Sequence, residues 1–216
     1  MTIRFFYKFL TVTFVALAMS TNANADIITI PINVAEFETG SPVSQAIDFG
    51  VDVLSIESIS IDLSHSFASD VDVGLYAPTD DQTGIGVVGD LGAEASYLLT
   101  EFAGDERTLG DGGDDLMGLA TYTWLNPGDP NATGEDFESI VAEGEAIPGG
   151  TYDAFEWGGG GAATGWVLSI VDGGNGDPGA IGTATINFTP VAVPEPTSLA
   201  VLLGLSGLTA CRRRRR

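Results

Sequence analysis

Between residues 26 and 193, apolar and polar side chains alternate along one short segment after another, and this alternation constrains the fold more than any other feature. Side chains on a β-strand point to opposite faces with a period of two, so alternating segments predict half-buried strands. No ten-residue stretch in this region combines the helical period with helix caps. The region is therefore predicted to be all-β.

The alternation predicts strands at Ile28–Val34, Ile59–Phe67 and Val71–Ala77. Later candidates along the chain are Ser96–Ala103, Leu119–Leu125, Glu138–Ala142, Gly165–Asp172 and Ile181–Thr189. Pro31 has no N–H to donate to a ladder, which predicts that its strand lies at a sheet edge. The segment Ala68-Ser69-Asp70 is predicted to turn the chain back into the third strand. Short strands separated by Gly- and Asp-rich loops predict a jelly-roll-like β-sandwich.

The first 25 residues have the composition of a secretory signal peptide. Arg4 and Lys8 make a cationic start, residues 9–19 are apolar, and Ala23-Asn24-Ala25 is an A-x-A cleavage site. The mature chain is therefore predicted to begin at Asp26. Retention of this segment as a membrane anchor is the alternative.

The C-terminal end combines three parts in a fixed order. They are the motif Pro194, Glu195 and Pro196, an uncharged and mostly apolar run over residues 197–211, and the cations Arg212, Arg213, Arg214, Arg215 and Arg216. As a transmembrane helix, the apolar run would span about 22 Å of a hydrocarbon core of about 30 Å, so the arginine stems would have to snorkel. Cytoplasmic arginines would place everything before Pro194 outside the inner membrane. An ordinary stop-transfer tail is the alternative interpretation.

With all three parts present, this end resembles the PEP-CTERM sorting signal of bacterial exported proteins. The resemblance implies recognition by an exosortase, a membrane cysteine transpeptidase that cleaves near the motif. The membrane anchor would then be temporary, and Cys211 would be lost with the tail. The predicted organisation is a signal peptide over 1–25, a β-sandwich domain over 26–190 and a sorting signal over 191–216.

The central region is strongly acidic. It contains 29 of the 30 acidic residues and, among the eight basic residues, only Arg107, which makes its formal charge −28. Such a surface repels phosphate backbones, so nucleic acid is not expected as a partner. The same charge repels itself, which favours stabilisation by bound cations. The region has no cysteine, so no disulfide is expected in it.

The order and spacing of residues in this region resemble the P domain (homo B domain) of proprotein convertases. The similarity begins with Val53, Ile56, Ile59, Ile61, His65, Asp70, Val71, Leu75 and Pro78, and it resumes with Phe155, Gly165–Asp172, Gly176, Asp177, Gly179, Ile181 and Ile186–Phe188. Ser69 and Thr79-Asp80 depart from the family's pattern, and no subtilisin-like protease domain accompanies the region. The resemblance implies a jelly-roll sandwich without catalysis of its own.

His65 is the single histidine of the chain and lies in phase with Ile61 and Leu63. This phase predicts a buried, structural histidine. Zinc catalysis would need several His or Cys ligands, and a serine triad would need a nucleophile elbow of the G-x-S-x-G type, which the sequence lacks. Paired carboxylates leave glycoside hydrolysis open, because it needs only two acids at about 5 Å or 6.5–9.5 Å.

One loop contains the residue types that calcium prefers. Asp172, Asn175 and Asp177 follow a predicted strand in a Gly-rich context, and hard cations favour carboxylate and carbonyl oxygens. These three residues are the predicted calcium ligands, and a solvated acidic turn is the alternative. Asp111, Asp114 and Asp115 form a weaker cluster of the same kind.

Among the three tryptophans, Trp166 is predicted to be in the core, and Trp157, beside four glycines, is a candidate platform for stacking against sugars. The sequence as a whole favours a non-enzymatic exported protein of the cell surface or extracellular matrix, with an extracellular polysaccharide as a candidate partner. Before processing it would be anchored in the inner membrane. A hydrolase acting on envelope or matrix polysaccharide is the alternative hypothesis.

Overall fold

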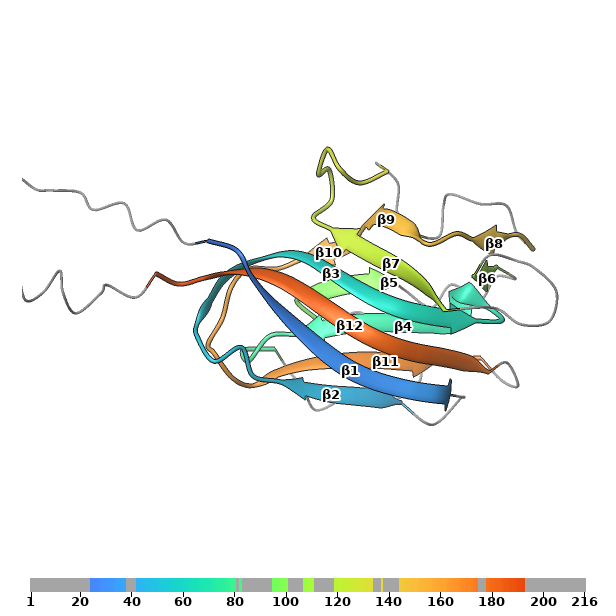
Figure 1. Cartoon of the computed structure of the whole chain (residues 1–216), viewed down its shortest axis with the longest axis horizontal. Helices are drawn as coiled ribbons and strands as arrows, with labels where there is room; N and C mark the ends of the chain where they lie inside the picture. Colours follow the sequence, from blue (N-terminus) through green and yellow to red (C-terminus); the bar gives the residue numbers. More distant parts are fainter. Residues whose placement is uncertain are drawn as a thin grey trace, which may run out of the picture. The chain divides into compact units, whose positions relative to one another are not determined.

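The computed structural model describes residues 24–37, 42–80, 82, 95–100, 107–110, 119–133, 137, 144–174 and 178–192. In these residues the regular structure is almost entirely β, and two sheets pack face to face as a sandwich (Figure 1). Residues from Ala23 to Val191 form one compact unit. The prediction of an all-β sandwich is therefore confirmed.

The larger sheet contains seven strands in the order β1-β12-β3-β6-β8, with β7 pairing with β3 and β9 pairing with β7. Its strands are β1 (Asp26–Phe37), β3 (Val53–His65), β6 (Thr108–Leu109), β7 (Ala120–Leu125), β8 (Ala146–Ile147), β9 (Gly150–Asp153) and β12 (Gly179–Pro190). The smaller sheet has the order β10-β5-β4-β11-β2. Its strands are β2 (Val43–Ile47), β4 (Val71–Tyr76), β5 (Tyr97–Thr100), β10 (Glu156–Trp157) and β11 (Trp166–Asp172).

Most of the predicted strands are present, and Pro31 lies on an edge strand as predicted. The turn predicted at Ala68–Asp70 is the 3-10 helix η1, but it carries the chain from β3 in one sheet to β4 in the other. The alternation does not predict β2 or the first part of β3. In β3 the register against β12 shifts near Leu54 and Glu57, and these bulges break the period of two. The predicted strand at 138–142 lies outside the described residues.

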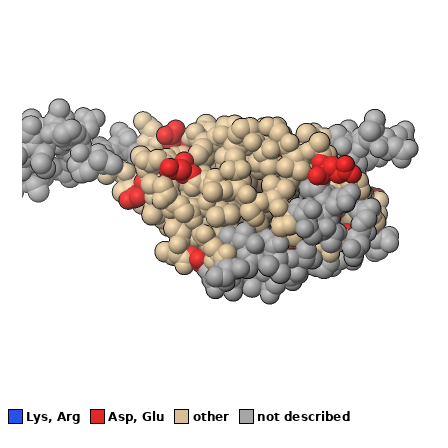
Figure 2. Space-filling model, turned by 90° about the horizontal axis from the view of Figure 1, so that it is seen from below, with Lys and Arg blue, Asp and Glu red and all other residues tan. Residues whose placement is uncertain are grey.

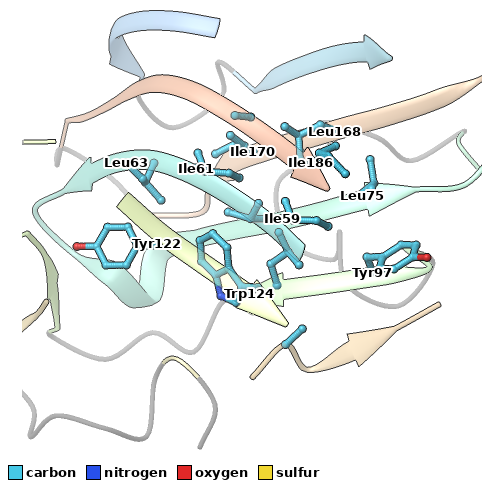
Figure 3. Close-up of a cluster of buried hydrophobic side chains, with 14 of the residues drawn as sticks. Ile59, Ile61, Leu63, Leu75, Tyr97, Tyr122, Trp124, Leu168, Ile170 and Ile186 are labelled. Carbon is cyan, nitrogen blue, oxygen red and sulfur yellow. The ribbon is translucent and has the colours of Figure 1, made fainter. Parts of the chain in front are cut away.

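The core lies between the two sheets and is filled by the alternating side chains that the sequence places inward (Figure 3). Ile59, Ile61 and Leu63 of β3 are each 0% exposed. They belong to the same buried cluster as Leu75 of β4 and Ile170 of β11. Burial of each such side chain contributes about 1.5–3 kcal/mol, so this alternation largely decides which faces of the sheets meet.

Trp157 is partly buried rather than freely exposed. Its Nε1–H donates to the carbonyl of Ile56 at 3.1 Å, and its ring packs edge-on against Tyr97 at a centroid distance of 5.0 Å. The Tyr97 hydroxyl in turn donates to the carbonyl of Gly159 at 2.6 Å, and burial raises the pKa of that phenol to about 12. The prediction of an exposed stacking platform at Trp157 is therefore wrong. Trp166 is fully buried, as predicted.

The glycines that follow Trp157 are required by close packing. Gly161 and Val53 exchange two backbone hydrogen bonds, each of 2.9 Å. A Cβ added to Gly160 would overlap the carbonyl oxygens of Val53 and Leu54, whereas a Cβ added to Gly159 would meet nothing within 4 Å. The loop therefore lies directly against the start of β3.

No helix in the described ranges has the length and apolar character needed to cross a membrane. The predicted transmembrane segment, residues 197–211, lies outside those ranges, as does the signal peptide up to residue 23.

We expect Gly160→Ala to lower the free energy of unfolding by about 1–3 kcal/mol, because the added methyl group must displace the backbone of β3. Gly159→Ala is the matched control and should change it by no more than about 0.5 kcal/mol. Chemical denaturation of the two variants measures the difference. Equal effects of the two substitutions would contradict the close packing of this loop.

Candidate functional site

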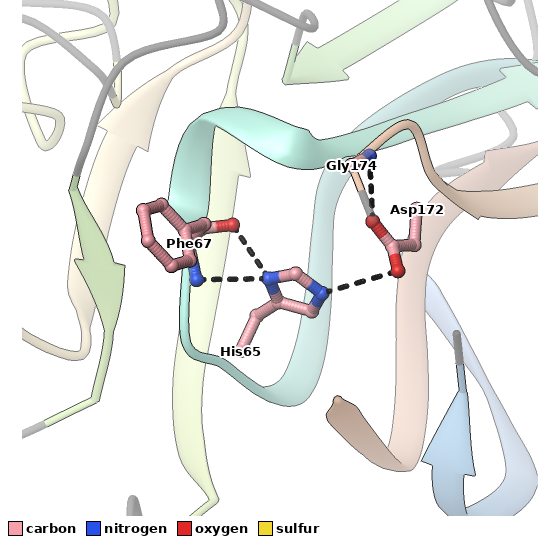
Figure 4. A network of polar contacts seen from close by, with 4 residues as sticks. All are labelled: His65, Phe67, Asp172 and Gly174. Carbon is pink, nitrogen blue, oxygen red and sulfur yellow. Dashed lines mark hydrogen bonds and ion pairs between the residues drawn. The ribbon is translucent and has the colours of Figure 1, made fainter. Parts of the chain in front are cut away.

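His65 and Asp172 come together in the interior, although 107 positions separate them in the sequence (Figure 4). His65 is the last residue of β3 in the larger sheet, and Asp172 is the last residue of β11 in the smaller sheet. Nε2 of His65 lies 3.7 Å from Oδ2 of Asp172, and both side chains are 0% exposed. The pair therefore joins the two sheets at one end of the sandwich.

The turn after β3 holds the imidazole ring from the other side. Nδ1 of His65 lies 2.6 Å from the carbonyl oxygen of Phe67 and 3.0 Å from the backbone nitrogen of the same residue. With a proton on Nδ1, the ring donates to that carbonyl; without it, Nδ1 accepts from that N–H. Either tautomer thus has a backbone partner in Phe67.

The turn after β11 holds the carboxylate in the same way. Oδ1 of Asp172 accepts from the backbone N–H of Gly174 at 2.9 Å, and the N–H of Gly173 donates to the carbonyl of Asp70 at 2.7 Å. A Cβ added to Gly174 would overlap the Asp70 carboxylate. The start of the β11–β12 loop is therefore packed against η1, and a side chain at residue 174 would require the Asp70 side chain to move.

This arrangement supports a structural role for His65, as the alternation predicts. Neither the ring nor the carboxylate is accessible to a substrate in this conformation, because both are enclosed. A buried polar pair of this kind is expensive to break, since removing one partner leaves the other desolvated and poorly paired. The pair also specifies how the ends of β3 and β11 are placed against each other.

The sequence analysis does not identify Asp172 as the partner of His65. A signal for it exists: Asp172 lies in phase with Leu168 and Ile170, which are 1% and 0% exposed. The same phase that places His65 inside on β3 thus places Asp172 inside on β11. The sequence does not indicate that the ends of β3 and β11 lie next to each other.

The predicted calcium ligands are placed only in part. Asp172 is described and faces the interior, whereas Asn175 and Asp177 lie outside the described residues, as do Asp111, Asp114 and Asp115. Within the described parts of the chain, no group of three or more His, Cys, Asp or Glu side chains could hold a metal ion. Calcium binding by Asp172, Asn175 and Asp177 therefore stays a prediction.

The sorting motif Pro194–Pro196 and the cations Arg212–Arg216 also lie outside the described residues. The surface that is described shows the acidic character of the domain (Figure 2). On the face shown there, red carboxylates are spread among uncharged residues, and no described Lys or Arg is visible. Arg107, the only basic residue of the domain, is partly buried, and its carbonyl accepts a hydrogen bond from the backbone of Ala68 in η1.

The chain matches no protein-family model and no curated protein sequence. Two solved structures show weak structural similarity to it. One is the complex of the Aeromonas sobria serine protease with the chaperone ORF2, with 13% sequence identity and a TM-score of 0.34, over 78% of this chain and 28% of that chain. The other is the serine protease of Aeromonas sobria, with 14% identity and a TM-score of 0.33, over 77% of this chain and 27% of that chain. The chain thus spans little more than a quarter of the length of those chains, and similarity at this level indicates no function.

We expect His65→Ala to lower the free energy of unfolding by about 2–4 kcal/mol, because it leaves a cavity and a buried carboxylate without its ring partner. Asp172→Ala should also destabilise the domain. The double variant should lose less than the sum of the two single losses, with a coupling energy of about 0.5–3 kcal/mol. Denaturant unfolding of the four proteins measures this cycle.

Asp153→Asn is a suitable control for the cycle. Asp153 is 8% exposed, and its Oδ1 accepts a hydrogen bond from the backbone N–H of Gly128, in the turn after β7. Its effect should add to that of His65→Ala without coupling. Additive losses for His65→Ala and Asp172→Ala would show that the two side chains do not stabilise each other.

Proposed function

We propose that the chain is a non-enzymatic protein of the cell surface or extracellular matrix, exported by its signal peptide and sorted by an exosortase through Pro194-Glu195-Pro196. The folded part would be a P-domain-like jelly roll that is anchored in the inner membrane until the tail is cleaved. Extracellular polysaccharide is the candidate partner. The support comes from where the folded unit begins and ends relative to the two predicted processing sites.

The observation that carries the proposal is the position of the first and last strands. β1 begins at Asp26, directly after Ala23-Asn24-Ala25, and Asp26 pairs with Phe188 of β12. β12 ends at Pro190, which is four positions before Pro194. Cleavage at both predicted sites would therefore remove no residue of either strand, and the buried core, from Ile30 to Phe188, would remain complete.

Both ends of the folded unit leave from the same end of the sandwich (Figure 1). This follows from the antiparallel pairing of β1 with β12, in which the start of one strand lies beside the end of the other. Between Val191 and the apolar run at Thr197, the chain could span about 20 Å when extended. Both predicted processing sites therefore adjoin the same end of the folded unit.

The pairing of strands supports the jelly-roll interpretation. β1 and β2 pair antiparallel with β12 and β11, and the chain crosses between the sheets from β1 to β2 and again from β11 to β12. The segment β1–β2 and the segment β11–β12 thus run side by side like a long hairpin that is rolled around the core. This is the arrangement of a jelly roll. β3 and β4 continue the pattern, since they pair with β12 and β11.

The charge of the domain limits the partners that fit this role. With 29 acidic residues and one basic residue between Asp26 and Val193, the surface favours neutral or cation-bearing polymers and disfavours polymers rich in phosphate or sulfate. A neutral polysaccharide satisfies this condition.

Processing at both ends is the first test. We expect the mature protein to begin at Asp26 and to end between Pro194 and Thr197, as measured by mass spectrometry of the protein recovered from the cell surface. Replacement of Pro194 and Pro196 by Ala should leave the tail attached. Replacement of Arg212–Arg216 by Ser should weaken retention and orientation in the membrane, because the cytoplasmic positive charge is lost. Intact arginines on the mature surface form would refute the sorting proposal.

Calcium binding is tested separately from sorting. If Asp172, Asn175 and Asp177 bind calcium in the folded state, a hundredfold excess over Kd should add about 2.7 kcal/mol to the free energy of unfolding. Asp177→Asn is the better variant, because Asp172 also pairs with His65. It should remove the calcium-dependent rise in melting temperature and leave the response to sodium unchanged. Identical melting curves in calcium and in sodium of matched ionic strength would show that no such site exists.

A further inference from the structure

We infer that β2 is a self-pairing edge, through which two copies of this chain associate about a two-fold axis and join their smaller sheets into one. The inference does not depend on the proposed sorting function. It rests on the openness of β2, on the direction of its backbone groups and on its amino-acid sequence.

No other described strand covers the outer side of β2. Within the described part of the chain, β2 is the last strand of the smaller sheet and pairs with β11 alone. No backbone hydrogen bond joins its outer side to any other described residue. Ser44 and Ala46 are exposed, and Val43 and Gln45, whose side chains point the opposite way, are only partly buried. The inward face of β2 is thus incompletely covered, as expected where a sheet stops.

One side-chain contact indicates which backbone groups point outward. Nε2 of Gln45 donates to the carbonyl of Ala46 at 3.0 Å, in an exposed position. This carbonyl therefore points away from the ladder with β11. Because the N–H and C=O of a residue in an antiparallel strand point to the same side, and alternate residues point to opposite sides, Ser44 and Ala46 both direct their N–H and C=O outward.

The sequence Val43-Ser44-Gln45-Ala46-Ile47 matches itself when it is read antiparallel. With Gln45 on the axis, Ser44 of one copy would lie opposite Ala46 of the other, and these two hydrogen-bonded pairs would use the outward groups of both residues. Val43 would lie opposite Ile47, and both belong to or pack against the hydrophobic core. The pairing thus continues the core from one copy into the next, with small residues on the outer face.

β1 is an edge strand of the larger sheet, and its edge differs from that of β2. It contains Pro31, which has no N–H, and Asn33, whose φ is +54°, and its register against β12 shifts on both sides of Val34. Prolines and bulges of this kind prevent a second strand from pairing with an edge. β2 has no proline, no positive φ and no register shift against β11. The contrast favours β2 as the edge that accepts a partner.

Charge further favours β2. The domain carries a formal charge of −28, so two copies repel each other over most of their surfaces. β2 carries no charged residue, so pairing through it brings no carboxylate of the strand itself into the contact. The interface is small, at or below about 1,200 Å², so we expect a weak dimer that strengthens as salt screens the remaining repulsion.

Disulfide trapping in the full chain tests this geometry. With Cys211→Ser as the background, Gln45→Cys would place two sulfurs across the axis in a non-hydrogen-bonded pair, where Cα atoms are about 4.5 Å apart and a disulfide can form. Mild oxidation, followed by electrophoresis without reductant, should give several-fold more dimer than Thr29→Cys, an exposed position on β1. The yield should rise with sodium chloride.

A second substitution in the same strand separates specific pairing from random collision. Ser44→Pro removes an outward N–H but leaves the ladder with β11 intact, so combined with Gln45→Cys it should reduce the dimer to the level of the Thr29→Cys control. Ser44→Ala, the matched control, keeps the N–H and should cross-link like Gln45→Cys alone. Equal dimer yields from Gln45→Cys and Thr29→Cys, or no effect of Ser44→Pro, would overturn the inference.

Discussion

The sandwich depends on the ladder that β12 forms with β1 on one side and β3 on the other. β12 is the last strand of the chain, and it pairs with the first strand and with the longest one. Its inward residues Ala184, Ile186 and Phe188 are 0–2% exposed and complete the core of the larger sheet. Without β12, β1 would have no partner among the described strands, and β3 would keep β7 and β6 along only its second half. The fold therefore cannot close until nearly the whole domain is available, and such non-local pairing is slow.

The buried pair of His65 and Asp172 lies at the end of the sandwich opposite to the one where β1 begins and β12 ends. There β3 and β11 finish, and the chain passes from one sheet to the other through η1 and through the β11–β12 loop. Backbone groups of both turns are bonded to the pair, so the polar side chains specify the turns as well as each other. Hydrophobic burial alone is compatible with several arrangements of two sheets. A buried polar pair that must also keep its hydrogen bonds to the backbone of two turns is compatible with few.

The surface combines two kinds of region with different physical consequences. Carboxylates keep copies of the domain apart and select against anionic partners. The edge at β2 carries no charged residue, and its outward backbone groups are available for pairing. Membrane anchoring, as proposed above, would raise the effective concentration at which a weak edge contact operates.

The sequence by itself determined the class of fold, the edge position of the strand with Pro31, and the burial of His65, because a period of two is a local property that each segment carries. It could not determine β2, since a segment as short as Val43–Ile47 shows too little alternation, nor the bulges at Leu54 and Glu57, which arise from the register with β12. The partner of His65, the close packing of Gly160 and the partial burial of Trp157 were likewise decided only by the tertiary structure. Each depends on segments about 100 positions apart in the chain, and no local pattern encodes which of them will meet.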